Sequence, residues 1–172
     1  MKTLIFDATP LIYLARIGLS NLLETIPAPK FASRSVFTEV VEHGRAKGHA
    51  DALALAHLFE VKAIGIVDPS DRGILRTLRK VRGLEQPDAE TLAVAKERDY
   101  RAVVDDLLAR RVAKTYGIDF VGTPFILLLA TQSRLLAKQD ALRAVDDMVE
   151  AGWRCGPELY REITRMIENA TP

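Results

Sequence analysis

Acidic side chains at four places along the sequence have the residue type that metal-dependent hydrolysis needs. Asp7 directly follows the apolar run KTLIF, and the pair Asp105 and Asp106 follows RAVV. Glu39 lies within a helical pattern, and Asp88 opens another one. Each acid also has a structural explanation, as a turn residue, a solvated helix residue, a partner of the helix dipole or an N-cap. A role in chemistry therefore depends on whether the fold brings these acids together.

Carboxylates gathered at one point raise each other's pKa, and a hard divalent cation relieves that repulsion. Mg²⁺ needs only one or two carboxylates besides waters and substrate phosphate oxygens. The acids have no cysteine or histidine partners at metal-ligand spacing, which argues against zinc. A Mg²⁺ or Mn²⁺ site of this kind, with one ion or with two about 3.5–4 Å apart, suits the hydrolysis of phosphodiester bonds.

The acids take different roles in this interpretation. Asp7 and one of Asp105 and Asp106 bind the metal directly. Asp88 binds it directly or through a water, and Glu39 holds a water on the metal or a second ion. We therefore expect all of these carboxylates to face one anionic pocket.

The elements that position these acids follow from the alternation of apolar runs and helical patterns. We expect strands over residues 2–6, 30–33, 63–67, 101–104 and 118–121. Strands that alternate with helices predict a three-layer α/β/α domain with a central parallel sheet of four to five strands. Ligands bind such sheets at the carboxyl ends of the strands, where the acids after the first and fourth strands should meet.

Helix boundaries are predicted from caps and stops. Thr9 is interpreted as the N-cap of the first helix, with Pro10 at its first position, and its hydroxyl could also orient a water. Gly44 is interpreted as the stop of a helix over residues 35–43, and Ser70 as the cap of a basic helix that runs to about residue 81. Thr123 and Pro124 repeat the cap-then-proline pattern.

Composition limits the class of protein. The chain has 172 residues, a formal net charge of +1 and one cysteine. This length suits one folded unit, which we divide into a nuclease-like part (residues 1–136) and a C-terminal helical hairpin packed on it (residues 137–172), with helices over 138–151 and 157–169. A nearly neutral chain binds nucleic acid through a local patch. We expect a soluble, cytoplasmic protein without a membrane segment.

Three segments together resemble the PIN-domain family: LIFDATPLIYLARIGL, SVFTEVVEHG and PDAETLAVAKERDYRAVVDDLLARRVAKTYGIDFVGT. The resemblance covers about residues 2–136, and the C-terminal helices fit it too. The pieces DATPLI, DDLLAR and VGT resemble a VapC-related prokaryotic branch. The resemblance implies a divalent-metal-dependent ribonuclease, frequent homodimers, and often a toxin that an antitoxin protein neutralises.

The resemblance also implies which acids of this sequence correspond to the acidic positions of the family. Glu39 takes the place of the second acid of the family. Asp88 or Glu90 takes the third place, and we prefer Asp88 because it lies nearer the strand edge. Asp106 is our preferred fourth acid, with Asp105 second.

Basic residues provide the candidate substrate contacts. Arg110 follows Asp106 by one helical turn, so it forms either an ion pair or a phosphate contact. Arg76 and Arg79 belong to a basic segment that is either a solvated helix face or an RNA-backbone patch.

Other functions are compatible with the same sequence. The chain could be a catalytically silent PIN-like interaction module, or a DNA-directed or structure-specific nuclease of the same fold. A haloacid-dehalogenase-like phosphatase would need an aspartate where Thr9 stands. A nucleotide-dependent small-molecule enzyme is disfavoured because neither glycine-rich phosphate motif is present.

Overall fold

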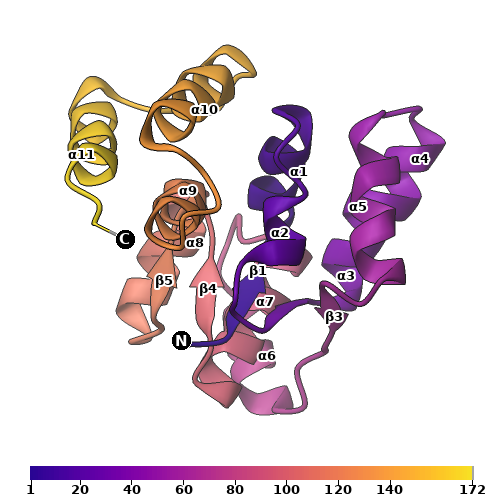
Figure 1. Ribbon diagram of the computed structural model, residues 1–172. Coiled ribbons are helices and arrows are strands. Elements are labelled where there is room, and N and C mark those ends of the chain that lie inside the picture. Colours follow the sequence, from indigo (N-terminus) through magenta and orange to yellow (C-terminus); the bar gives the residue numbers. More distant parts are fainter. Residues whose placement is uncertain (172) are drawn as a thin grey trace.

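The computed structural model describes residues 1–171, so Pro172, the last residue of the predicted C-terminal segment, lies outside the described residues. Five strands form one parallel sheet in the order β3-β2-β1-β4-β5 (Figure 1). Their bounds are β1 Leu4–Phe6, β2 Lys30–Ala32, β3 Gly65–Ile66, β4 Arg101–Val103 and β5 Phe120–Val121. All five predicted strands are present, each shorter than expected.

Helices cover both faces of this sheet. The helices on one face are α1 Ala8–Arg16, α2 Leu22–Thr25, α3 Arg34–Phe37, the π-helix η1 Thr38–His43, α4 Gly44–Ala46, α5 Asp51–Glu60, α9 Thr123–Gln132, α10 Lys138–Glu150 and α11 Pro157–Glu168. The opposite face carries α6 Arg72–Leu78, α7 Gln86–Arg98 and α8 Leu107–Thr115. The three-layer α/β/α architecture is therefore confirmed.

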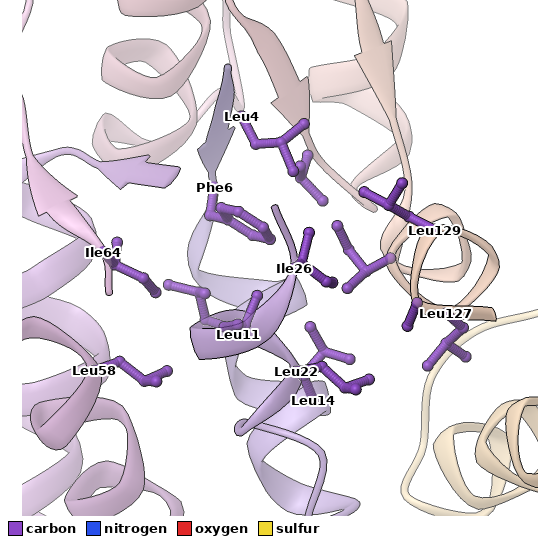
Figure 2. Close-up of a cluster of buried hydrophobic side chains, with 14 of the residues drawn as sticks. Leu4, Phe6, Leu11, Leu14, Leu22, Ile26, Leu58, Ile64, Leu127 and Leu129 are labelled. Atoms are coloured by element: carbon purple, nitrogen blue, oxygen red, sulfur yellow. The ribbon is translucent and has the colours of Figure 1, made fainter. Parts of the chain in front are cut away.

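The central strand β1 contributes side chains to both hydrophobic layers, because successive side chains of a strand point to opposite faces. Leu4 and Phe6 belong to the larger buried cluster, together with residues of α1, α5 and α9 (Figure 2). Ile5 belongs to the second cluster, against α7 and α8. Because β1 is buried on both faces, its position is fixed by packing. This packing also fixes the position of Asp7, which directly follows the strand.

The predicted stop at Gly44 is wrong. Gly44 has helical backbone angles, with φ −59° and ψ −48°, and the helical segment continues through α4 to Ala46. A Cβ on Gly44 would lie 2.8 Å from the Cβ of Ala52 on α5. The glycine therefore permits a close helix–helix approach, and Gly48, with φ +72°, follows the true end of the segment.

Three predicted N-caps are also displaced by one or two residues. Asp7 stands at the cap position of α1 in place of Thr9, and Asp71 caps α6 in place of Ser70, accepting from Gly73 and Ile74. Gly122 precedes α9, so Thr123 is its first residue. Local sequence does not distinguish cap positions that lie one or two residues apart.

The final helices α10 and α11 both contact α9 and lie beside it at the β5 end of the sheet (Figure 1). Met148, Ile163 and Ile167 place their buried side chains in the larger core cluster. Within residues 1–171, no helix combines the length and the apolar character that crossing a bilayer requires.

A candidate carboxylate metal site

The carboxyl ends of β1 and β4 lie side by side where the chain direction across the sheet reverses. Phe6 is in register with Val103, and the Asp7 amide donates to the Val103 carbonyl at 3.1 Å. From β1 the chain moves outward to β2 and β3, and from β4 it moves the other way to β5. Parallel α/β sheets bind their ligands at this kind of crevice.

Four predicted acids line one cavity at this edge, which we call the carboxylate cavity. It has a volume of about 370 Å³, and its walls are Asp7, Ala8, Thr9, Glu39, Gly83, Glu85, Pro87, Asp88, Asp106 and Leu108. Among these described lining residues, five are acidic and none is basic. Residues from four distant parts of the chain thus make one anionic pocket.

Asp7 is the most buried of these acids, with 4% of its surface exposed. Burial raises the pKa of Asp7 well above its ordinary value, and the charge of Asp88 raises it further. The amides of Ala8 and Thr9 at the start of α1 act in the opposite direction. An ionised Asp7 in this pocket therefore needs a positive partner.

Asp88 lies in the first turn of α7, where it completes a capping box. Its Oδ2 accepts from the Glu85 amide at 3.4 Å, and Glu85 caps the helix in return. Burial raises the pKa of Asp88 to about 6, with a further contribution from the Asp106 charge. The cap fixes the backbone around Asp88 and so directs its carboxylate at the cavity.

Glu39 is presented by the π-helix η1. A π-helical segment changes the direction of side chains relative to a regular helix, and such segments are frequent at functional sites. Burial raises the pKa of Glu39, the Glu85 charge adds to this, and His43 and Lys47 lower it. Glu39 also lines a neighbouring cavity of about 770 Å³ that carries Arg34, His43 and Lys47.

Asp106 is exposed and caps α8, where its Oδ1 accepts from the Ala109 amide at 2.9 Å. Asp105 lines a different cavity, because its carboxylate accepts from both the amide and the hydroxyl of Thr123. Burial raises the pKa of Asp105, while Thr123, the Trp153 side chain and Arg110 lower it. Of the two adjacent aspartates, only Asp106 lines the carboxylate cavity, whereas Asp105 is held at the start of α9.

Glu90 is engaged outside the carboxylate cavity. Its carboxylate accepts from the Ser35 hydroxyl at 2.5 Å, from Gln86 at 2.8 Å and from Arg79 at 3.1 Å. These contacts connect α7 to α3 and α6. The geometry thus favours Asp88 over Glu90 as the third acid of the site.

The predicted basic contacts lie outside this cavity. Arg79 pairs with Glu90, and exposed Arg76 lines none of the cavities described here. The Arg110 guanidinium lies 5.4 Å from the centroid of the Phe120 ring. Among the described residues it forms no ion pair with Asp106. Arg110 borders a cavity next to the carboxylate cavity instead.

The carboxylates of the cavity do not lie close enough together to bind one ion directly. Across residues 1–171, no group of three His, Cys, Asp or Glu side chains converges closely enough to hold a bare ion. The donor set nevertheless fits Mg²⁺ or Mn²⁺: it consists of oxygens, it carries excess negative charge, and its cavity has room for waters. Since Mg²⁺ keeps several of its waters, wider carboxylate spacing suits a hydrated ion.

Sequence reasoning missed a second set of side chains beside the carboxylates. Tyr13, Trp153 and Arg154 line the cavity that also contains Arg110. Residues 152–156 were interpreted only as a turn between the last two helices, and no local signal connects that turn with Tyr13. Only packing of the C-terminal helices brings these residues to the site.

Comparison with known families agrees with this geometry. A family model described as DUF3368: PIN domain matches residues 3–169. The match includes all five strands, the four predicted acids at the carboxylate cavity, and the whole of both C-terminal helices. No curated protein matches the chain.

Proposed function

Because the chain belongs to the PIN-domain family, we propose that it is a divalent-metal-dependent nuclease that hydrolyses phosphodiester bonds, with RNA as its substrate. The observation that carries this proposal is the carboxylate cavity. Four acids from separate elements line it without a basic side chain, at the switch point of a parallel sheet. A hard cation and a phosphodiester together match that charge distribution.

In this proposal, Asp7, Asp88 and Asp106 hold Mg²⁺ or Mn²⁺. The bound ion would polarise the phosphate and neutralise the charge that develops on the leaving oxygen. Burial of Asp7 and Asp88 excludes solvent from one side of the cavity and so strengthens these electrostatic interactions.

Glu39 acts on the attacking water. It is half-buried at the rim of the cavity, and its raised pKa brings its carboxylate closer to the range in which proton transfer is efficient. One oxygen of Glu39 accepts the proton of the water that attacks phosphorus. The Thr9 hydroxyl lines the same cavity and orients that water by a hydrogen bond.

A cleavage assay with purified protein tests the function. We expect cleavage of labelled RNA with Mg²⁺ or Mn²⁺, none with EDTA, and a loss of at least about 100-fold for Asp7→Asn, a typical effect of removing an electrostatic group from an active site. Asp140→Asn is the matched control, because Asp140 is exposed on α10 and lines none of the cavities described here. Undiminished cleavage by Asp7→Asn would exclude this role of Asp7.

The finer proposal is a VapC-like toxin, acting as a homodimer and neutralised by an antitoxin protein. It is supported by the similarity of the segments around Asp7 and Asp106 to that branch. Induced expression in a bacterial host should arrest growth, and Asp7→Asn should restore it because RNA cleavage is the source of toxicity. Equal growth arrest by both proteins at equal abundance would contradict the toxin proposal.

A further inference from the structure

A second cavity, which we call the flanking cavity, lies directly beside the carboxylate cavity. It has a volume of about 830 Å³ and shares Thr9 and Asp106 with its neighbour. That volume lies within the range of about 300–1,000 Å³ that small-ligand pockets occupy. If the phosphate of a substrate lies at the carboxylates, the flanking cavity therefore has space for the neighbouring unit of that substrate, such as one nucleotide.

The chemistry of the flanking cavity differs from that of the carboxylate cavity. Arg110 and Arg154 supply positive charge, and Tyr13 and Trp153 supply aromatic surface. Arginine recognises phosphate oxygens by paired hydrogen bonds, and bases of unpaired nucleotides stack on aromatic rings. Proteins that bind single-stranded nucleic acids combine positively charged groups, which contact the backbone, with aromatic side chains, on which the bases stack. The flanking cavity has both.

The cavity on the opposite side has a different character. It shares Glu39 and Pro87 with the carboxylate cavity, and its other lining residues include Arg34, His43 and Lys47. Among its described lining residues none is aromatic, apart from the imidazole of His43. Base stacking is therefore favoured on the Tyr13 side, and phosphate contacts alone on the other.

The four arginine and aromatic side chains of the flanking cavity come from three parts of the chain. Tyr13 comes from α1, Arg110 from α8, and Trp153 and Arg154 from the loop between α10 and α11. That loop is held in place because α10 contacts both α1 and α9. Trp153 is buried and forms a wall, whereas Tyr13 is half-buried and Arg154 is exposed. The Arg16 guanidinium lies over the Tyr13 ring, 5.8 Å from its centroid, so the other face of the ring is the stacking surface, and Arg154 is the accessible cation.

We propose that the flanking cavity is a nucleotide subsite that binds the unpaired residue next to the cleaved phosphodiester, with its base on Tyr13 and its phosphate at Arg154 and Arg110. The position next to the cleaved bond rests on the proposed nuclease function. Binding itself does not, and it can be measured without any cleavage.

The chain contains one tryptophan, so its intrinsic fluorescence reports on the wall of this cavity. We would titrate the Asp7→Asn protein in EDTA with a six-nucleotide single-stranded RNA, the matching single-stranded DNA, and the RNA annealed to its complement. Trp153 emission should change saturably with the single strands and not with the duplex. A preference between RNA and DNA would identify which of them the subsite takes.

Substitutions in the flanking cavity test whether the single strand binds there. Tyr13→Ala and Arg154→Ala should each weaken binding about fivefold or more, in line with the loss of one stacked base or one phosphate contact. Tyr13→Phe should retain binding because it keeps the ring. Arg161→Ala is the control, because Arg161 is exposed on α11 and lines none of these cavities.

The nucleotide subsite and the nuclease function can be tested separately, the first by RNA binding and the second by cleavage. In cleavage assays Arg154→Ala should raise KM and leave kcat nearly unchanged. Binding that depends on Tyr13 and Arg154 without any metal-dependent cleavage would support the subsite and contradict the nuclease. Unchanged binding in both variants, or equal binding of the duplex, would overturn the subsite even if the protein cleaves RNA.

Discussion

At the scale of single residues, the carboxylate cavity shows how burial and mutual repulsion prepare acids for a cation. Burial and the Asp88 charge raise the pKa of Asp7, and burial and the Asp106 charge raise that of Asp88 to about 6. A buried carboxylate that ionises without a partner destabilises the folded state. We therefore expect the ionised acids to reduce stability in the metal-free protein, and a bound cation to offset this effect.

Asp88→Asn tests this view in metal-free protein. A folded-state pKa of about 6, above the ordinary value of 3.8, gives a stability contribution that is present below pH 3.8 and lost as the pH rises through 6. At pH 7.5 the variant should therefore be more stable by about 1–3 kcal/mol, and at pH 3.5 the difference should vanish. Urea unfolding at both pH values measures this, and a variant that is less stable at pH 7.5 would show that Asp88 is needed for its capping bond.

At the scale of elements, helix starts place most of the acids. Asp7 stands at the cap position of α1, Asp88 lies in the first turn of α7, and Asp106 caps α8. The positive end of a helix dipole favours a carboxylate at each place. The same positions therefore serve helix initiation and, in the proposed function, metal binding, and separate variants can distinguish the two roles.

Asp106 allows the two roles to be separated. Asparagine caps a helix about as well as aspartate, whereas alanine does not, so Asp106→Ala should lose about 1 kcal/mol of stability and Asp106→Asn much less. Both variants should lose metal-dependent cleavage, because both lack the carboxylate charge. Thermal unfolding and a cleavage assay on the same preparations give the answer, and a fully active Asp106→Asn would remove Asp106 from the metal site.

At the scale of the whole molecule, the proposed metal site would couple metal binding to protonation and to folding. Metal binds ionised carboxylates, so protonation of the cavity acids competes with it. The helices α10 and α11 add a second coupling, because the loop between them completes the cavity beside the metal site. The metal site and its neighbouring cavity thus depend on elements from both ends of the chain.

Mn²⁺ binding should depend strongly on pH. At pH 7.5, above the Asp88 pKa of about 6, a concentration of Mn²⁺ about 100 times Kd should raise Tm by about 5–10 °C. At pH 5.0 Asp88 is mostly protonated, which alone weakens Mn²⁺ binding about tenfold, so the shift should fall by about half or more. Differential scanning calorimetry at the two pH values measures both effects. An equal shift at both pH values would mean that the ion binds elsewhere.

Much of this molecule is determined by sequence patterns that act locally. Apolar runs separated by helical patterns predicted the five strands and the α/β/α layers, and the acids after the first and fourth strands predicted the edge of the site. These features follow from periodicity and from the geometry of parallel sheets, which need no knowledge of distant contacts. The roles of Glu39, Asp88 and Asp106 were assigned from the resemblance to PIN domains instead.

Tertiary structure decided which neighbouring side chain faces which cavity. Asp105 and Asp106 are adjacent in sequence, yet Asp105 bonds to Thr123 and Asp106 lines the carboxylate cavity. Likewise, Gly44 lies inside a helical segment, where it permits the close approach of α5, and Arg154 lines the same cavity as Tyr13 only through packing of the last helices. Side-chain direction and close approach depend on partners far along the chain, so no local pattern contains them.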